Sequence, residues 1–368
     1  MRGGGMTSGL LRLQLISLSA VFFFCTGLST SPVPPNPAEN PSLQNAFVAL
    51  QAWKKVITRD PHNVTGSWVG ADVCTYRGVF CSPPPDAKFE TVVSGIDLNH
   101  ARLAGVFPME LGLLIYIAIF HVNSNFFQGT IPSSFKCLTL LFELDVSNNM
   151  LSGSFPSVVL ELPSIKYLDL RFNHFGGPLP GGLFTMPLDA IFVNDNNFYG
   201  IIPSNLGCSA VSVVNFANNH FHGAIPDSIG KMATTLNEIL FINNKFSGCI
   251  PQPVASLNQL NVLDVGTNRL SGLLSDSLGL LRNLRILNVA NNFFTGIIPI
   301  SICSLPKLTN FTCTNNYFIK VSPPCLRLPS AGVIFNDVAN CIPNQPLPRL
   351  LKQCLAFLLQ PLSCRLTI

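Results

Sequence analysis

Apolar and polar residues alternate in short segments that recur along most of the chain. The clearest copies are "LDVSNNMLSGSFP" (144–156), "LDLRFNHFGGPLP" (168–180), "LDVGTNRLSGLLS" (263–275) and "LNVANNFFTGIIP" (287–299). In each copy two apolar residues flank a single more polar one, as Leu144 and Val146 flank Asp145. This alternation predicts a short strand with one buried face. One such strand per copy at a regular period predicts a parallel sheet made by stacked repeats.

An asparagine follows each predicted strand at the same place. It occurs at Asn125, Asn149, Asn173, Asn196, Asn219, Asn244, Asn268, Asn292 and Asn316, with Ala101 in the equivalent place of a first, degenerate copy. An amide side chain offers both donors and acceptors, so we expect it to satisfy backbone groups where the chain leaves the strand. Stacked copies therefore predict an asparagine ladder. A glycine four residues later permits unusual dihedrals, and its replacement by Lys320 in the last copy marks the predicted end of the array.

A helix is predicted immediately before the repeats, in "NPSLQNAFVALQAWKKVITRD". Asn40 and Pro41 form a favourable helix start. The apolar residues that share one face of this helix are Leu43, Phe47, Leu50, Trp53 and Val56. We expect this face to cover the open end of the stack.

Composition and charge narrow the class of protein. Residues 1–30 place Arg2 and Arg12 before an apolar stretch from Leu15 to Cys25, which predicts a signal peptide and a secreted protein. No later segment is long and apolar enough for a membrane span. The formal net charge of +4 falls to +2 without the two arginines, so no strong basic field indicates nucleic acid.

The cysteines and two glycosylation motifs agree with export. Twelve cysteines become eleven when Cys25 is removed, so most are expected to pair and at least one is expected to be free or intermolecular. An intermolecular bond would make a covalent homodimer. "NVT" at Asn63 and "NFT" at Asn310 are N-glycosylation acceptors.

The repeats carry the leucine-rich repeat pattern and resemble its plant extracellular subclass. The strings "LQNAFVALQAWKKVI", "WVGADVCTYRGVFC", "GIDLNHARLAG", "IGKMATTLNEI" and "VIFNDVANCIP" narrow the likeness to the amino-terminal half of leucine-rich repeat extensins, which are plant cell-wall proteins. The resemblance implies an α/β leucine-rich repeat solenoid, a horseshoe of about ten 24-residue repeats with a parallel sheet on its concave face and disulfide-bonded caps. It also implies a structural bond between Cys74 and Cys81. The expected organisation is a signal peptide (1–30), an amino-terminal cap (31–90), ten repeats (91–323) and a carboxy-terminal cysteine-containing cap (324–368).

The same resemblance implies a function. In that family the repeat domain binds small, basic, cysteine-rich signalling peptides of the rapid alkalinization factor type, it is not an enzyme, and it needs no cofactor. Cell-wall polysaccharide and a receptor kinase are the further partners that the resemblance implies. Secretion to the plant cell wall or apoplast, and a part in wall formation and integrity signalling, are the corresponding expectations.

This sequence departs from the family pattern in two places. Nothing like a Ser-Pro-rich extensin tail follows Cys364 in this sequence, so the resemblance does not imply wall cross-linking through such a tail for this chain. Cys249 faces Ala224 of the preceding repeat and is expected to lack its usual cysteine partner. The cysteines assigned to the carboxy-terminal cap, with their connectivity left open, are Cys303, Cys313, Cys325, Cys341, Cys354 and Cys364. Within this cap, Phe357 and Leu358 are expected to pack on the final repeat.

A binding surface is predicted on the concave face, where solenoids of this kind usually bind. Four of the ten residues between the two inward positions of each strand are aspartates. Carboxylates pair with arginine and aromatic rings supply buried contact area, so this face suits a basic, folded peptide. The residues assigned to it are Asp97, His121, Glu143, Asp145, Tyr167, Asp169, Arg171, Phe172, Phe192 and Asp195.

Other function classes remain as alternatives. A defence protein resembling polygalacturonase inhibitors would be a secreted array of similar length, and an inhibition assay against a fungal polygalacturonase would distinguish it. A structural wall component is the third reading. Catalytic and metal sites are not expected: His100 and His121 near Asp97, and the pair His220 and His222, match no recognised motif.

Overall fold

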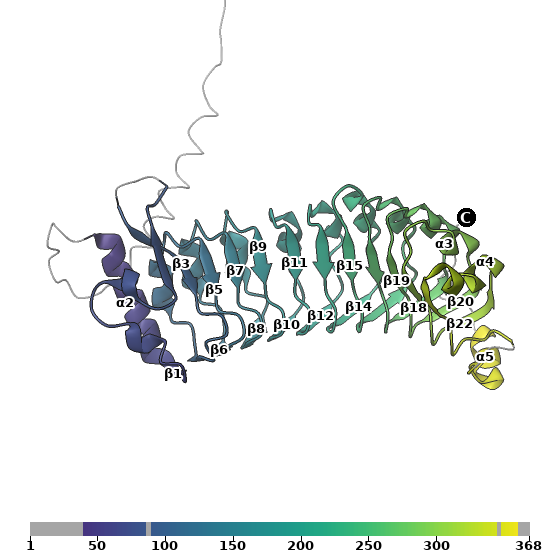
Figure 1. The fold of residues 1–368 in the computed structure, drawn as a ribbon, viewed down its shortest axis with the longest axis horizontal. Helices are drawn as coiled ribbons and strands as arrows, with labels where there is room; N and C mark the ends of the chain where they lie inside the picture. The colour runs from purple at the N-terminus through teal and green to yellow at the C-terminus, as the bar shows by residue number, and fades with distance from the viewer. Residues whose placement is uncertain (1–39, 86–89, 344–346, 360–368) are drawn as a thin grey trace, which may run out of the picture.

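The computed structural model describes residues 40–85, 90–343 and 347–359. The predicted signal peptide and Cys364 lie outside these described residues. Figure 1 shows an elongated solenoid in which successive turns of the chain lie side by side along the long axis. The predicted leucine-rich repeat fold is therefore confirmed.

The larger of two sheets, here called the main sheet, contains twelve strands. In spatial order they are β2 (Val79–Ser82), β3 (Val92–Asp97), β5 (Ile119–His121), β7 (Glu143–Asp145), β9 (Tyr167–Asp169), β11 (Ala190–Phe192), β13 (Val213–Asn215), β15 (Glu238–Leu240), β17 (Val262–Asp264), β19 (Ile286–Asn288), β21 (Asn310–Thr312) and β23 (Ile334–Asn336). All neighbours pair in parallel except β2 and β3, which are antiparallel. The order follows the sequence because each strand belongs to one repeat.

A second sheet, here called the flanking sheet, contains eleven strands. They are β1 (Ile57–Arg59), β4 (Ala104–Gly105), β6 (Phe126–Gly129), β8 (Met150–Ser154), β10 (His174–Gly177), β12 (Asn197–Gly200), β14 (His220–Gly223), β16 (Lys245–Gly248), β18 (Arg269–Leu273), β20 (Phe293–Ile298) and β22 (Tyr317–Val321). Figure 1 shows the strands β6 to β14 as a row below the row of main-sheet strands. The two sheets alternate along the chain, so each repeat contributes one strand to each.

Short helices complete the repeats. Between the flanking strand of one repeat and the main strand of the next lie η3 (Met109–Leu113), η4 (Ser133–Cys137), η5 (Ser157–Glu161), η6 (Gly181–Thr185), η7 (Leu206–Cys208), η8 (Asp227–Met232), η9 (Gln252–Ser256), η10 (Asp276–Leu280) and α3 (Ile300–Cys303). The caps contain α2 (Pro41–Val56), η1 (Thr65–Ser67), η2 (Val73–Thr75), α4 (Pro323–Leu326), η11 (Pro329–Ala331) and α5 (Leu351–Leu358). Each turn of the solenoid thus encloses a core between two strands and a short helix.

The register of the main sheet keeps equivalent residues in rows. Leu144 lies beside Leu168, and Asp145 lies beside Asp169. Leu144 and Val146 are fully buried, whereas Asp145 is on the open face. A parallel register in which like residues align gives one buried row on each side of one open row, as the alternating pattern predicts.

The asparagine ladder is present and is longer than the sequence indicated. The Nδ2 of Asn292 donates to the carbonyl of Val265 in the preceding repeat at 2.9 Å, and its Oδ1 accepts from the backbone N–H of Leu270 at 2.9 Å. The sequence reading ends this ladder at Asn316. The structure adds Asn340, which is fully buried and accepts from the backbone N–H of Phe318. Main-chain pairing therefore continues through β23, inside the segment assigned to the carboxy-terminal cap.

The amino-terminal cap forms as predicted. The Oδ1 of Asn40 accepts hydrogen bonds from the backbone N–H groups at the start of α2, and Pro41 occupies its first position. Trp53 is fully buried and its ring lies 5.8 Å from that of Trp68, centre to centre. The disulfide between Cys74 and Cys81 is confirmed. The cap therefore covers the first repeat with a cluster of aromatic rings.

The described cysteines of the carboxy-terminal end form two bonds, Cys303–Cys325 and Cys341–Cys354. Cys313 is a buried free thiol, and Cys208 is an exposed free thiol in η7. Cys249 and Cys137 are both disulfide-bonded, and that Cys249 lacks its usual partner in the preceding repeat stays a prediction.

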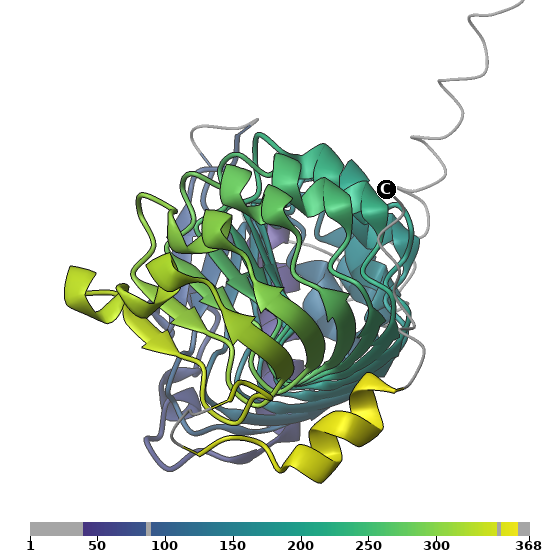
Figure 2. The same cartoon turned by 90° about the vertical axis from the view of Figure 1, so that its right-hand side faces the viewer.

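The last helix, α5, lies at the carboxy-terminal end of the solenoid (Figure 2). Its only buried residue is Cys354. The ring of Phe357 stacks on Tyr317 of the final flanking strand with centroids 3.7 Å apart, which confirms its predicted packing. Leu358 remains exposed, so the same prediction is wrong for this residue. Because α5 is only eight residues long, only part of its surface can reach the last repeat.

Candidate functional site

The open face of the main sheet carries most of the acidic strand residues. Six carboxylates lie on its strands, at Asp97, Glu143, Asp145, Asp169, Glu238 and Asp264. The only basic residue on the described main-sheet strands is His121. Four of these carboxylates, at Asp97, Glu143, Asp145 and Asp169, lie in the amino-terminal half of the face. The charge they give this half depends on which of them is neutralised by a neighbouring side chain.

Three of the predicted residues lie together on β5 and β7. The Nε2 of His121 is 2.9 Å from the Oε2 of Glu143, which forms an ion pair when the imidazole is protonated. Asp145 lies beside His121 in register and accepts hydrogen bonds from both the backbone N–H and the hydroxyl of Ser147. Asp97 ends the adjacent strand β3 and is exposed. This group presents carboxylate oxygens that have no arginine or lysine partner among the described residues.

Asp169 is in a different state. Its side chain has 0% exposure, and the Nε of Arg171 lies 2.9 Å from both carboxylate oxygens. Burial raises the pKa of Asp169, and the hydrogen bonds from Arg171 oppose that rise. The sequence reading treated Asp169 as a carboxylate available to a ligand. In the structure its charge is already met by an arginine two residues away.

Aromatic rings enclose this buried pair. The guanidinium carbon of Arg171 lies 4.7 Å from the ring centre of Phe192, and the hydroxyl of Tyr167 donates to Asp169 at 3.2 Å. Burial, together with the nearby Asp169 and Asp145, raises the pKa of Tyr167 to about 12. The phenol is therefore a neutral hydrogen-bond donor in the physiological range. These side chains form a rigid aromatic platform beside Asp145.

Two of the predicted residues lie elsewhere. Phe172 and Asp195 have φ angles of 52° and 55° and occupy the turns that lead from the main sheet to the flanking sheet. Phe172 is 50% exposed at this edge. Asp195 accepts hydrogen bonds from Asn194 and Asn218. The structure therefore brings together eight of the ten predicted residues on the open face and places these two at its edge.

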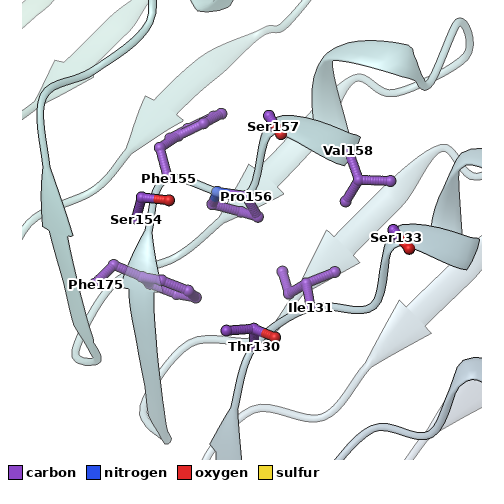
Figure 3. A pocket seen from close by; sticks show the side chains of 9 residues that line it. All are labelled: Thr130, Ile131, Ser133, Ser154, Phe155, Pro156, Ser157, Val158 and Phe175. Carbon is purple, nitrogen blue, oxygen red and sulfur yellow. The ribbon is translucent and has the colours of Figure 1, made fainter.

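A small pocket lies away from this face. It has a volume of about 190 Å³ and is lined by residues of three successive repeats, from flanking strands and the short helices that follow them (Figure 3). Its lining includes Phe155, Phe175 and several serines, with no charged residue. Such a small, uncharged pocket offers no carboxylate to a basic ligand, so the open face of the main sheet remains the candidate site.

The two glycosylation motifs occupy different places. Asn63 lies in the amino-terminal cap, in a turn with a φ of 50°. Asn310 begins β21 on the main sheet, and its Oδ1 accepts a hydrogen bond from Thr312 at 3.0 Å. Asn310 is six strands from Asp169 in the sheet order, which corresponds to about 29 Å at the usual strand spacing. A glycan on Asn310 would therefore project from the same face of the main sheet as the acidic group, but near the carboxy-terminal end of that sheet.

The described residues show neither a metal centre nor a membrane-spanning helix. No cluster of three or more histidine, cysteine or acidic side chains suited to a metal ion occurs among them. No helix in this part of the chain has the length and apolar character needed to span a bilayer. His220 and His222 both lie exposed on β14 of the flanking sheet, and His100 lies in a turn.

Family models agree with the architecture. Residues 116–175 and 283–305 match leucine-rich repeat models, and residues 44–82 match the leucine-rich repeat amino-terminal domain. Among solved structures, a TDR receptor is 30% identical with a TM-score of 0.64, covering 68% of this chain and 44% of that one. The plant peptide hormone receptor RGFR1 in complex with RGF2 is 26% identical with a TM-score of 0.64, covering 72% of this chain and 43% of that one.

Curated relatives come from Arabidopsis thaliana. Leucine-rich repeat extensin-like proteins 2 and 4 are each 65% identical over 43% of this chain, but the matched part covers only 20% and 32% of their own lengths. This chain thus corresponds to a part of those relatives. Leucine-rich repeat extensin-like protein 6 is 54% identical over 89% of this chain and 69% of its own length. That extent of identity shows that the chain belongs to the leucine-rich repeat extensin-like family.

Proposed function

We propose that this protein binds a basic, cysteine-rich signalling peptide of the rapid alkalinization factor type on the open face of its main sheet. In this proposal it acts outside the cell, at the plant cell wall, in wall formation and integrity signalling. The observation that carries the proposal is the set of carboxylates at Asp97, Glu143 and Asp145 beside the aromatic platform of Tyr167 and Phe192. The likeness to the RGFR1 structure, described as a complex with RGF2, supports a peptide ligand.

The chemistry of the face favours a folded basic ligand. Unpaired carboxylates attract arginine and lysine, and Arg pairs with a carboxylate through two parallel hydrogen bonds. The aromatic platform supplies contact area at little cost in side-chain entropy, because Arg171 and Asp169 already hold it. Asp145 lies at the junction of the two groups, next to both His121 and Asp169 in register. It is therefore the residue on which we expect binding to depend most.

The test is a calorimetric titration of the secreted protein with a folded, disulfide-bonded rapid alkalinization factor peptide. Asp145→Asn keeps the acceptor oxygen for Ser147 but removes the charge, so we expect it to weaken affinity by about tenfold, equal to about 1.4 kcal/mol. Asp227→Asn is the matched control, because Asp227 is an exposed carboxylate on η8. Equal affinity for the native protein and Asp145→Asn would refute this site.

A further inference from the structure

The two sheets carry opposite charge. The described strands of the flanking sheet contain no aspartate or glutamate, whereas the main sheet has six. The basic residues of the flanking strands are Arg59, His174, His220, His222, Lys245, Arg269 and Lys320. The whole chain has 22 lysines and arginines and 18 aspartates and glutamates, so composition alone does not exclude acidic residues from one sheet.

The central part of this sheet carries a row of five basic side chains and one tyrosine, here called the basic strip: His174, Tyr199, His220, His222, Lys245 and Arg269. All six are exposed, while the phenylalanine between His220 and His222 is fully buried. In register, Tyr199 lies beside His220, and His222 lies beside Lys245. The strip crosses five neighbouring strands, which spans about 19 Å along the long axis at the usual strand spacing.

The charges of the strip are available to a partner. The ion pairs of His121 with Glu143 and of Arg171 with Asp169 both lie at the open face of the main sheet, away from the strip. The one carboxylate in the turns that lead into these flanking strands is Asp195, which already accepts hydrogen bonds from two asparagines. Positive charge on the strip is therefore not cancelled by neighbours in the described part of the chain.

The strip also offers a ring and several neutral donors. Tyr199 is 54% exposed on β12, between the strands that carry His174 and His220. An exposed aromatic ring can pack against the apolar C–H face of a sugar ring, and imidazole and phenol groups can donate to hydroxyls. A single exposed ring among spaced donors suits a hydroxyl-rich chain better than it suits stacked nucleotide bases, which need several aromatic platforms.

We propose that the basic strip binds an acidic polysaccharide, a linear chain of uronate sugars lying along the long axis of the solenoid. Carboxylates repeated along such a chain would meet Lys245, Arg269 and the histidines on successive strands. The row is narrow, so it fits a linear polymer better than a flat anionic membrane. This proposal is independent of peptide binding, because the peptide surface lies on the other sheet.

The test measures binding of the secreted protein to immobilised polygalacturonate at low salt. We expect binding that weakens as sodium chloride is added, because the contacts of exposed charges are screened. We expect the fully methyl-esterified polymer, which has the same backbone without the charge, to bind at least about tenfold more weakly. The double variant Lys245→Glu with Arg269→Glu should lose affinity to a similar extent, and Tyr199→Ala should lose part of it.

The control is Lys231→Glu with Arg282→Glu, which changes the net charge equally but lies at η8 and after η10. Both control residues are exposed. Loss of binding in this control equal to that in the strip variant would overturn the proposal, since net charge alone would then explain it. Unchanged polygalacturonate binding by the strip variant would also overturn the proposal. Binding of single-stranded DNA or of anionic vesicles as tightly as polygalacturonate would overturn it as well.

The two proposals can fail separately. The strip variant should retain its calorimetric affinity for the basic peptide, and Asp145→Asn should retain polygalacturonate binding. Loss of polymer binding by Asp145→Asn would contradict the assignment to the flanking sheet. Loss of peptide binding by Asp145→Asn, with polygalacturonate binding retained, would concern only the peptide site on the main sheet.

Discussion

At the scale of single residues, the pair Asp169 and Arg171 decides the electrostatics of the open face. A buried carboxylate is costly unless it is paired and hydrogen-bonded. Arg171 supplies that pairing from the same strand end, and it also lies over the ring of Phe192. The charge of Asp169, one of the carboxylates assigned to the binding surface, is thereby neutralised by Arg171. The charge that can attract a ligand is therefore concentrated at Asp145, Glu143 and Asp97.

We expect Arg171→Ala to lower the free energy of unfolding by on the order of 3 kcal/mol, because it leaves Asp169 buried without a cation. Burial raises the pKa of Asp169, and without the Arg171 guanidinium this rise loses its side-chain opposition, while the backbone N–H of residue 171 still donates to the carboxylate. A carboxyl whose pKa is higher in the folded state costs stability above that pKa and costs nothing where it is protonated in both states. The deficit should therefore be largest at neutral pH and should shrink on acidification.

Denaturant unfolding of the variant and the native protein at pH 7 and at pH 4 measures this effect. Arg171→Lys is the matched control, because it keeps the positive charge without the planar fork. It should lose clearly less stability than Arg171→Ala. A deficit that is the same at both pH values would contradict the assignment to a buried, unpaired Asp169.

At the scale of elements, two parallel rows of asparagines differ in their role. Asn292 is buried, and its side chain hydrogen-bonds four backbone groups, two in the preceding repeat and two in its own. Asn291 is exposed and has a φ of 54°, and its side chain hydrogen-bonds the side chains of Thr267 and Asn315 rather than buried backbone groups. The first row holds repeats together, whereas the second occupies a turn that asparagine tolerates well.

We expect Asn292→Ala to cost about 3 kcal/mol, because it leaves several buried backbone groups without partners. Asn291→Gly is the control, since glycine accepts the same positive φ and only exposed hydrogen bonds are lost. It should change stability by no more than about 0.5 kcal/mol. Thermal unfolding of the two variants gives the comparison, and equal losses would show that the buried row does not dominate.

Much of this could be read from the sequence, because the repeat fixes both period and face. Leu144 and Val146 predict a buried side, and the Asn–Gly spacing predicts the turn, where Gly153 has the expected positive φ of 94°. The pairing of Asp169 with Arg171 could not be predicted, because a strand pattern does not say how a long side chain folds back. Asn340 follows Asn316 by the same 24 residues, but Lys320 in place of the repeat glycine indicated that the array ends before it.

At the scale of the whole molecule, the last three strands of the main sheet, β19, β21 and β23, carry no aspartate or glutamate, unlike the sheet closer to the amino terminus. Their open face carries Asn288, Thr312 and Asn336. These residues belong to the same row of the sheet that holds Asp145 and Asp169 closer to the amino terminus. Asn310 lies on β21, the middle one of these three strands, so its glycan would project from a surface without acidic strand residues. A ligand bound at Asp145 would then lie well away from the glycan.

Thr312→Ala removes the glycosylation motif while keeping Asn310. We expect the intact mass of the secreted protein to fall by one N-glycan, and its affinity for the basic peptide to stay within about twofold, because the two places are about 34 Å apart at the usual strand spacing. Mass spectrometry and the same calorimetric titration measure both. A large gain in affinity without the glycan would place the peptide at the carboxy-terminal end instead.

The ladder also has a direction. Each ladder asparagine donates to a carbonyl of the repeat before it and accepts an N–H from that repeat, as Asn125 does toward Leu98 and Leu103. Ala101 has no earlier repeat to serve, which explains why the first copy needs no amide. During synthesis, therefore, the newest repeat to leave the ribosome is always incomplete. It can close only after the next asparagine, some two dozen residues later, has emerged, so the array should acquire its native hydrogen bonds from the amino end with a constant lag of one repeat.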